Sequence, residues 1–311
     1  MEHKEGMAPE ENPLVSICCL VYNHGEYLKE ALDGFLMQKT TFPFEVVIHD
    51  DASTDNSASI IKEYALKHPK IFKPLYQTEN QKSKLKSGMN PRFNFPRARG
   101  KYIAFCEGDD YWTDPLKLQK QVDFLERHPD YGVCFHNVLE VSCLGARREV
   151  VVPNVSNHHH YSIQDYILNN KTATCSVLIK KELFKLPNWF SSLPFGDLGI
   201  VLIVLKESKS QKGFVFKDTM GVYRVHEGGV HGSLKKNNSS LIKAYKQHIS
   251  FIRIISKKLL FEKKYKKFIY KKYSDTYKTL MDLSRKEHDK FNYIKFKILS
   301  RFYGYKCNSF K

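Results

Sequence analysis

The chain has 311 residues, of which 42% are hydrophobic, and its 50 Lys and Arg exceed its 33 Asp and Glu to give a formal net charge of +17. This length can bury a sizeable core in one large domain or two small ones. The polar residues 1–12 do not form a signal peptide, and the longest apolar run, Gly199 to Leu205, is too short to span a bilayer. We therefore expect a cytoplasmic protein.

The positive charge is concentrated in the C-terminal quarter of the chain. Residues 233–311 hold 22 Lys and Arg against 5 Asp and Glu, whereas the other 232 residues hold 28 of each sign. A net charge of this size is typical of proteins that bind nucleic acid, so its distribution along the chain matters. The sequence instead predicts an electrically balanced body followed by a basic appendage.

The cysteines predict reduced thiols in the core rather than disulfides. Their number is odd, they lack CxxC spacing, and most lie inside apolar runs. The seven are Cys18, Cys19, Cys106, Cys134, Cys143, Cys175 and Cys307.

Strand-like and helix-like segments alternate along the first half of the chain. Apolar runs predict strands at 14–21, 45–49, 71–77, 101–106 and 132–141, with a polar loop and a short helix over 78–100. Apolar residues at helical spacing predict three helices in this half. The first starts at Glu26, the second has Thr54 or Asp55 as its N-cap, and the third starts at the pair Asp114-Pro115. This order is typical of a doubly wound α/β fold, in which ligands bind outside the carboxyl ends of the strands.

Three of these strand ends carry polar residues. They are Tyr22-Asn23, Asp50-Asp51, and the run Glu107-Gly108-Asp109-Asp110. A parallel sheet would bring them to one rim. Adjacent carboxylates suit Mg²⁺ or Mn²⁺, which carboxylates and substrate phosphates commonly hold together, although an acidic turn that caps the next helix remains an alternative. Trp112, just beyond, is either a platform for a sugar ring or a core aromatic residue.

The second half is less regular. We predict a loop over Val150 to Tyr161, in which His158, His159 and His160 are solvated rather than bound to metal. A strand is expected over Thr174 to Ile179, and a strand pair over Phe214 to Val222. Asp197 is either the N-cap of an apolar helix or a buried reactive carboxylate.

The tail is strongly helical from Leu241 onward, with Lys pairs interleaved with Phe and Tyr. A basic helix with aromatic residues suits an anionic membrane surface. The alternatives are a solvated face on helices that pack against the body and, less favoured, a nucleic-acid contact.

Five segments occur in a fixed order along the chain: VSICCLVYNHGEYL, EVVIHDDASTDNS, RARGKYIAFCEGDDYWTDPLKLQKQ, FGD and YRVHEGG. Taken together, they resemble the family 2 glycosyltransferases of GT-A fold, most closely those of bacterial surface-polysaccharide gene sets. The resemblance covers Pro13 to Gly229, which suggests a GT-A domain over 13–232 and a basic helical region over 233–311.

The resemblance also implies roles for individual residues. Tyr22 would border the nucleotide base, Asp51 would contact the uracil or ribose, and the loop that contains Arg92 would correspond to the donor loop. Asp109 would face the ribose or diphosphate, and Asp110 would hold Mn²⁺ or Mg²⁺ together with Asp109. Because the chain has Glu-Gly-Asp-Asp in place of Asp-x-Asp, the choice between Glu107 and Asp109 as second ligand stays open. Asp197 would be the catalytic base, and His226 would lie near the diphosphate.

The function so implied is an inverting, metal-dependent transfer from a UDP-sugar to a glycan or lipid-linked acceptor at the cytoplasmic membrane face. A nucleotidyltransferase is the alternative enzyme, but it would carry a glycine- and lysine-rich phosphate loop where this chain has Tyr-Asn-His-Gly. A non-catalytic protein that binds membrane or nucleic acid is the alternative of another class. We expect no nucleic-acid partner.

Overall fold

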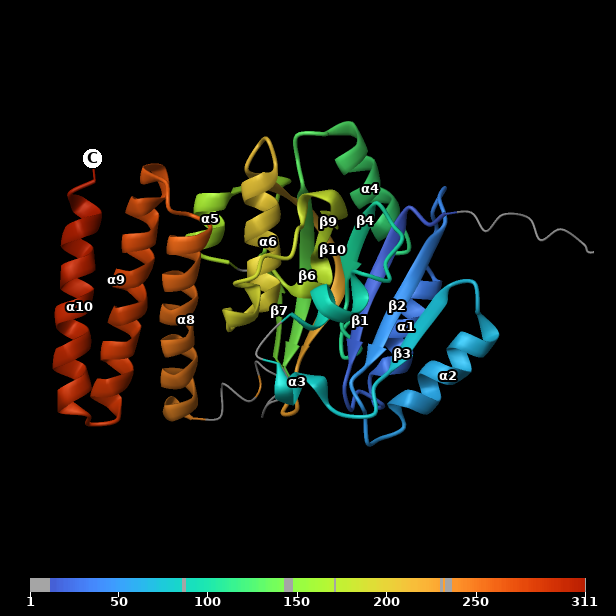
Figure 1. Cartoon of the computed structure of the whole chain (residues 1–311), viewed down its shortest axis with the longest axis horizontal. Coiled ribbons are helices and arrows are strands. Elements are labelled where there is room, and N and C mark those ends of the chain that lie inside the picture. Colours follow the sequence, from blue (N-terminus) through green and yellow to red (C-terminus); the bar gives the residue numbers. More distant parts are fainter. Residues whose placement is uncertain are drawn as a thin grey trace, which may run out of the picture.

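The computed structural model describes residues 12–85, 88–142, 148–170, 172–229, 232 and 237–310. A mixed sheet runs through the body in the order β3-β2-β1-β4-β9-β6-β10-β5, with β7 added beside β6 and β8 beside β10 (Figure 1). Strands β1 to β4 pair in parallel, and β9 is antiparallel to both β4 and β6. The strands are β1 (Val15–Val21), β2 (Phe44–Asp50), β3 (Phe72–Tyr76), β4 (Tyr102–Phe105), β5 (Tyr111–Trp112), β6 (Val133–Ser142), β7 (Arg148–Val152), β8 (His159–Ser162), β9 (Leu178–Lys180) and β10 (Lys212–Val225).

Helices cover both faces of this sheet, which confirms the doubly wound mixed architecture. Because successive strand side chains point to opposite faces, Ile17 and Cys19 of β1 pack in one apolar cluster while Cys18 packs in the other. The helices of the body are α1 (Leu28–Leu36), α2 (Ser57–Lys67), α3 (Gln81–Lys84), α4 (Lys117–Arg127), α5 (Ile163–Leu168) and α6 (Gly196–Glu207), with a π-helix η1 (Asn90–Asn94) and 3₁₀ turns η2 (Thr174–Ser176), η3 (Lys181–Leu183) and η4 (Phe190–Ser192).

Three long helices form the C-terminal region: α8 (Asn238–Lys258), α9 (Lys263–Lys286) and α10 (Lys290–Asn308). They stand side by side at one end of the long axis, with α8 nearest the body and α10 outermost (Figure 1). Ile252 and Ile255 of α8 share an apolar cluster with Ile200 and Val204 of α6, so the helices pack against the body. No helix in the described part of the chain is long and apolar enough to cross a membrane. The expected boundary at 232/233 adjoins residues 233–236, which lie outside the described ranges, and remains a prediction.

Some local predictions were wrong, and in each case a long-range contact decided the outcome. The expected loop over 150–161 contains the end of β7 and the start of β8, because β8 finds its hydrogen-bond partners in β10. The expected strand pair over 214–222 is the single strand β10, whose register shifts between Phe216 and Val222. The first half of the strand expected over 174–179 is the turn η2, where the carbonyls of Cys175 and Ser176 accept from the side chains of Trp112 and Gln121, and only its end belongs to β9.

The predicted buried thiols are confirmed where the structure describes them. Cys18, Cys19, Cys106, Cys134 and Cys175 are buried without disulfide partners, and Cys307 is half-buried. Cys143 lies outside the described residues. Trp112 is a core residue with 1% exposure, and its indole Nε1 donates to the carbonyl of Cys175 at 2.8 Å, so it is no sugar platform.

Candidate functional site

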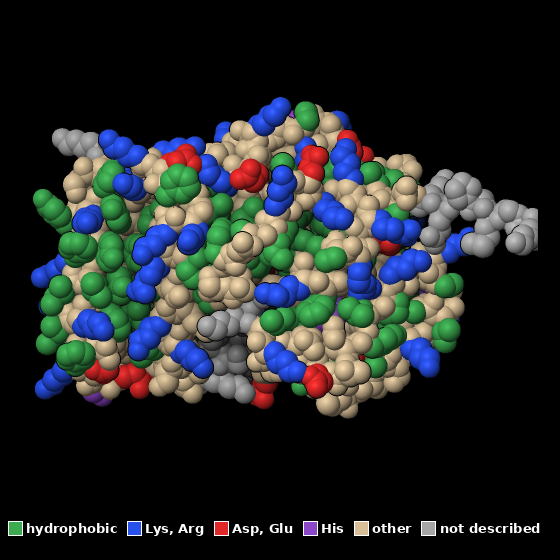
Figure 2. Space-filling view, viewed as in Figure 1, with side chains coloured by type: hydrophobic (Ala, Val, Ile, Leu, Met, Phe, Trp, Pro, Cys, Tyr) green, Lys and Arg blue, Asp and Glu red, His purple; other side chains and the backbone are tan. Residues whose placement is uncertain are grey.

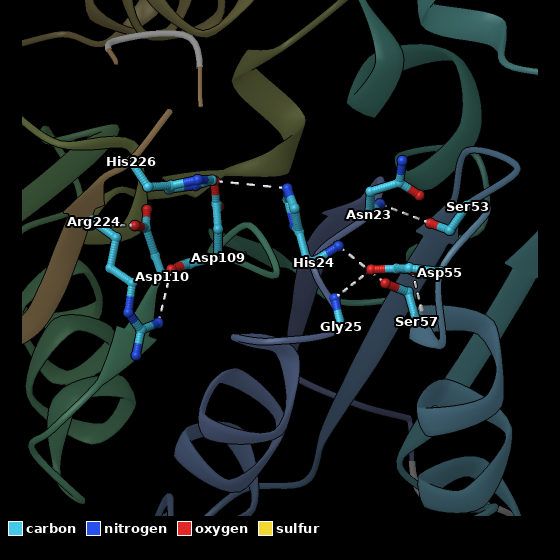
Figure 3. A network of polar contacts seen from close by, with 10 residues as sticks. All are labelled: Asn23, His24, Gly25, Ser53, Asp55, Ser57, Asp109, Asp110, Arg224 and His226. Atoms are coloured by element: carbon cyan, nitrogen blue, oxygen red, sulfur yellow. Dashed lines mark hydrogen bonds and ion pairs between the residues drawn. The ribbon is translucent and has the colours of Figure 1, made fainter. Parts of the chain in front are cut away.

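The turns that follow β1 and β2 are joined by hydrogen bonds at the carboxyl edge of the sheet (Figure 3). The backbone N–H of Asn23 donates to Ser53 Oγ at 3.0 Å, and the N–H of Gly25 donates to Asp55 Oδ2 at 2.8 Å. Asp55 Oδ1 also accepts from the N–H of Ser57 at 2.9 Å. Asp55 therefore holds both turns, although the structure places the N-cap of α2 one residue later, at Asn56.

The turn after β4 brings Asp109 between two histidines. Asp109 Oδ2 lies 3.1 Å from Nε2 of His226, at the end of β10, and 3.7 Å from Nε2 of His24, after β1 (Figure 3). Burial opposes ionisation of Asp109, but the hydrogen bond to His226 and the charge of His24 lower its pKa. Burial lowers the pKa of His24. An ionised carboxylate thus faces the imidazole nitrogens of residues from two distant strands.

Arg224, in β10, fixes the shape of this acidic turn. Its backbone N–H donates to Asp110 Oδ1 at 2.9 Å, and its Nη1 donates to the carbonyl of Asp109 at 2.8 Å. Its Nη2 pairs with Glu30 of α1 at 2.7 Å. The guanidinium also lies over the rings of Tyr27 and Tyr111, at 5.1 and 4.4 Å from their centroids. The turn between β4 and β5 is therefore held from both α1 and β10.

Asp110, the next residue, lies deeper in the protein than Asp109. It is 1% exposed, and burial raises its pKa well above the usual range. Behind it, the fully buried Lys117 places Nζ 3.6 Å from the ring centroid of Trp112. Asp110 and Asp109 are adjacent in sequence, yet only Asp109 faces the histidine pair.

Two of the residues expected to bind the donor, Asp51 and Tyr22, directly follow β2 and β1 at the carboxyl edge of the sheet. Asp51 is 4% exposed, and its two carboxylate oxygens accept from the backbone N–H groups of Gln81 and Lys82 at 2.7 and 2.9 Å. Asp51 therefore anchors α3, the start of the basic loop. Tyr22 is 45% exposed at the end of β1, with its ring open to a ligand. Arg92 is exposed on η1.

Asp197 lies in the first turn of α6 and is exposed, so it is neither the N-cap, which is Phe195, nor a buried carboxylate. Thr174 Oγ1 donates to its Oδ2 at 3.4 Å. Burial first, then the charges of Asp109 and Asp197, raise the pKa of Glu107 to about 8. Asp109 and Asp197, which are far apart in the sequence, thus both contribute to the raised pKa of Glu107.

The described residues contain no group of three or more His, Cys, Asp or Glu side chains arranged to hold a metal ion. Two features nevertheless fit a cation. Mutually repelling carboxylates at Glu107 and Asp109 are costly unless a positive charge shares the site. His226 presents an imidazole nitrogen to the same carboxylate, and carboxylate oxygen with imidazole suits Mn²⁺ and related ions.

Sequence reasoning missed His24, Glu30 and Arg224. His24 could have been found, because it follows the first strand at the same rim as the acidic runs. Arg224 lies in the quoted segment YRVHEGG, but its contact with Glu30 joins β10 to α1 and had no local signal in the sequence. The site is thus an acidic turn flanked by histidines, with a separate carboxylate on α6 and a polar, partly basic loop after β3.

The family model described as "Glycosyl transferase family 2" matches residues 16–184, which is more than half of the chain and includes the acidic turn. The chain belongs to glycosyl transferase family 2. The match begins in β1 and ends beyond η3, so Asp197 and His226 lie outside it.

Curated relatives agree with this membership. An uncharacterised protein of Mycobacterium tuberculosis strain H37Rv is 39% identical over 219 residues, or 70% of this chain and 60% of that protein. The putative glycosyltransferase EpsE of Bacillus subtilis is 34% identical over 143 residues, covering 46% of this chain and 49% of EpsE. The putative teichuronic acid biosynthesis glycosyltransferase TuaG of Bacillus subtilis is 34% identical over 115 residues, covering 36% and 42%. The chain spans about 60% of the length of the mycobacterial relative.

Solved structures show the same fold. S. aureus TarS 1-349 in complex with UDP-GlcNAc superposes with a TM-score of 0.54 at 16% identity, over 92% of this chain and 91% of that 1-349 chain. Mannosyltransferase PcManGT from Pyrobaculum calidifontis, in complex with GDP-Man and Mn²⁺, gives a TM-score of 0.53 at 19% identity, over 76% and 64%. The family 2 chain therefore has a GT-A fold with a C-terminal helical extension.

Proposed function

We propose that this protein is an inverting, metal-dependent glycosyltransferase. It transfers a sugar from a nucleotide donor, with UDP as the preferred nucleotide, to a hydroxyl of a glycan or lipid-linked acceptor in surface-polysaccharide biosynthesis. The observation that carries the proposal is the pairing of Asp109 with His226 at the strand edge, with Asp197 on a separate element that acts on the same acidic group. Membership of family 2 supports it.

On the donor side, the exposed ring of Tyr22 is available to border the base, and Asp51 lies beside it at the end of β2. Both oxygens of Asp51 already accept backbone N–H groups from α3, so its contact with the uracil or ribose is coupled to the position of the basic loop. Arg92, exposed on η1 within the loop over 78–100, would supply positive charge to the diphosphate.

The divalent cation, Mn²⁺ or Mg²⁺, would be held by Asp109 and His226. The sequence expectation placed Asp110 together with Asp109 on the cation; we propose His226 in place of Asp110 because Asp110 is buried and its Oδ1 accepts from the backbone N–H of Arg224. When bound, such a cation stabilises the charge that develops on a diphosphate leaving group. Asp110 and Arg224 would instead keep the acidic turn in place.

On the acceptor side, Asp197 would take the proton of the attacking hydroxyl. Its exposed position at the N-terminal turn of α6 leaves it accessible to an acceptor. Tyr166, Asn170, Thr172 and Thr174 line a small cavity beside it, and their polar groups suit a ligand rich in hydroxyls. A donor held on one side and a base on the other is the arrangement that in-line displacement with inversion needs.

Thermal stabilisation by a panel of UDP-, GDP- and CDP-sugars, with Mn²⁺ and with EDTA, tests this proposal. We expect a shift that is selective for UDP-sugars, needs the metal, and is lost in Asp109→Asn. A shift with GDP- or CDP-sugars alone would show that the donor nucleotide is GDP or CDP rather than UDP. No shift with any nucleotide would overturn the proposal.

We also propose that transfer takes place at the cytoplasmic face of the membrane, with the basic C-terminal region in peripheral contact with anionic lipid. The buried free thiols suit a reducing compartment, and the charge of residues 233–311 suits anionic lipid. An enzyme assay with an acceptor presented in vesicles, compared with the same acceptor in detergent, tests this part.

A further inference from the structure

The outermost helix, α10, exposes a continuous apolar stripe. Its members Phe291, Ile294, Ile298, Phe302 and Tyr305 are 76%, 57%, 61%, 48% and 76% exposed. At about 100° per residue, these positions fall within a stripe roughly 80° wide and about 21 Å long. Five exposed apolar residues aligned on one helix exceed the scattered apolar residues of an ordinary surface.

The opposite side of α10 accounts for its packing against α9. Phe296 is 4% exposed in the core, and the ring of Tyr303 stacks on Tyr273 and Tyr277 of α9 at 4.5 and 5.8 Å between centroids. The helix thus has two apolar faces, one buried and one covered by no described part of the chain. The exposed face is therefore not needed to hold α10 in place.

Positive charges border the exposed stripe on both sides. At about 100° per residue, Lys295 and Lys306 fall on one side, and Lys290, Lys297 and Arg301 fall on the other. The helix contains no Asp or Glu. The acid next to its start, Asp289, accepts from the backbone N–H of Asn292 as the N-cap. Figure 2 shows Lys and Arg side chains interspersed with apolar groups over this end of the molecule.

We propose that the outer face of α10 docks onto an anionic lipid surface, with the five stripe residues entering the interface and the flanking Lys and Arg contacting acidic headgroups. Apolar residues between rows of cations are the pattern of a helix that lies in the interfacial plane. Each basic side chain near such a surface adds to the attraction. No described helix can span a bilayer, so the contact is peripheral.

A second copy of this chain fits the surface less well. Pairing two α10 stripes would bring ten positive groups together, five from each helix, with no acidic residue of either helix to offset them. Like charges placed opposite each other disfavour such an interface. The charge pattern therefore favours an anionic bilayer. The proposal rests on the membrane contact proposed above and names the face that makes it, but it does not depend on which donor or acceptor the body binds.

Flotation of the full chain with vesicles of phosphatidylcholine containing phosphatidylglycerol tests the proposal. We expect binding that weakens with salt and with removal of the anionic lipid. The triple variant Ile294→Gln, Ile298→Gln, Phe302→Gln should bind at least roughly tenfold more weakly. Leu66→Gln is the matched control, because Leu66 is an apolar residue that is 73% exposed on α2, away from α10, and its binding should not change.

A charge variant, Lys295→Gln with Arg301→Gln, removes one cation from each side of the stripe and should weaken binding to anionic vesicles by roughly tenfold. Equal melting temperatures would show that all variants fold, and unchanged thermal stabilisation by nucleotide sugars would show that the donor site is intact. Vesicle binding that survives the triple variant would overturn the proposal. So would a lack of vesicle binding by the unchanged protein, or a dimer in sedimentation that the triple variant abolishes.

Discussion

Nε2 of His226 lies 3.1 Å from Oδ2 of Asp109, although 117 residues separate them in the chain. The contact joins the end of β10 to the turn after β4, so a residue beyond the family 2 match reaches the acidic turn inside it. His24 approaches the same oxygen from the turn after β1, at 3.7 Å. This one carboxylate therefore links three strand ends.

Asp109→Asn or His226→Gln should remove the metal-dependent response to nucleotide sugar. Each variant lacks one of the groups that face the proposed cation, and kcat/KM should fall by roughly 10²-fold to 10³-fold. Isothermal titration with Mn²⁺ and UDP-sugar, together with steady-state rates, measures both effects. His159→Gln is the control, since His159 is exposed on β8. Retention of metal-dependent binding in both site variants would show that the cation lies elsewhere.

Asp197→Asn should slow turnover while leaving donor binding intact. A positioned general base contributes roughly 10²-fold to 10⁴-fold, so kcat should fall by that factor. Asp282→Asn, on the exposed surface of α9, is a matched control with the same chemical change. If Asp197→Asn weakened donor binding as much as it lowered kcat, Asp197 would be a donor residue rather than the base.

Arg224→Met should loosen the acidic turn. It loses the bond from Nη1 to the carbonyl of Asp109, and leaving that carbonyl unpaired should cost about 1 to 3 kcal/mol of unfolding free energy. Glu30→Gln removes the partner of Nη2, but the Glu30 side chain is 56% exposed, so its effect should stay below about 1 kcal/mol. Urea denaturation of both variants measures the difference. If both variants lost the same unfolding free energy, the stabilisation would come from the exposed ion pair between Arg224 and Glu30 instead.

Lys117→Met should stabilise the protein at neutral pH. Burial lowers the pKa of Lys117 to about 7, below its ordinary value of 10.5. Between about pH 7 and pH 10.5 the unfolded chain holds a proton that the folded protein does not, so the group makes stability rise with pH in this window. Below pH 7, Lys117 is charged in both the folded and the unfolded state, so the full free-energy cost of burying this charge is present. Replacing it with an apolar side chain should raise the unfolding free energy at pH 7 by on the order of 3 kcal/mol.

Melting temperatures of the Lys117→Met variant and of the unchanged protein, followed from pH 6 to pH 10, check this prediction. The difference between them should shrink as the pH rises, because the unchanged protein recovers stability when Lys117 is neutral in both states. Lys62→Met, at an exposed position on α2, is the control and should show no such trend. A constant difference across the range would mean that Lys117 is charged in the folded protein or that its burial carries no cost.

Much of the sheet could be predicted because its signals are local. Apolar runs such as Leu14–Val21 and Glu45–His49 become β1 and β2 almost unchanged, and the acidic turn follows β4 as expected. Strand β8 could not be predicted in the same way. His159–Ser162 has no apolar run, and it is a strand only because β10 supplies its hydrogen-bond partners.

The sequence by itself determined that carboxylates and histidine lie at the ends of strands. A buried strand is an apolar run of β-branched and aromatic residues, and the change to polar residues marks its end. It also determined that the positive charge is confined to the tail. Only the tertiary structure decided that Asp109 faces the histidines while Asp110 turns inward, because the direction of each side chain in a turn depends on partners such as Arg224. The packing of α9 likewise decided which face of α10 is left exposed, since either apolar face could have been buried.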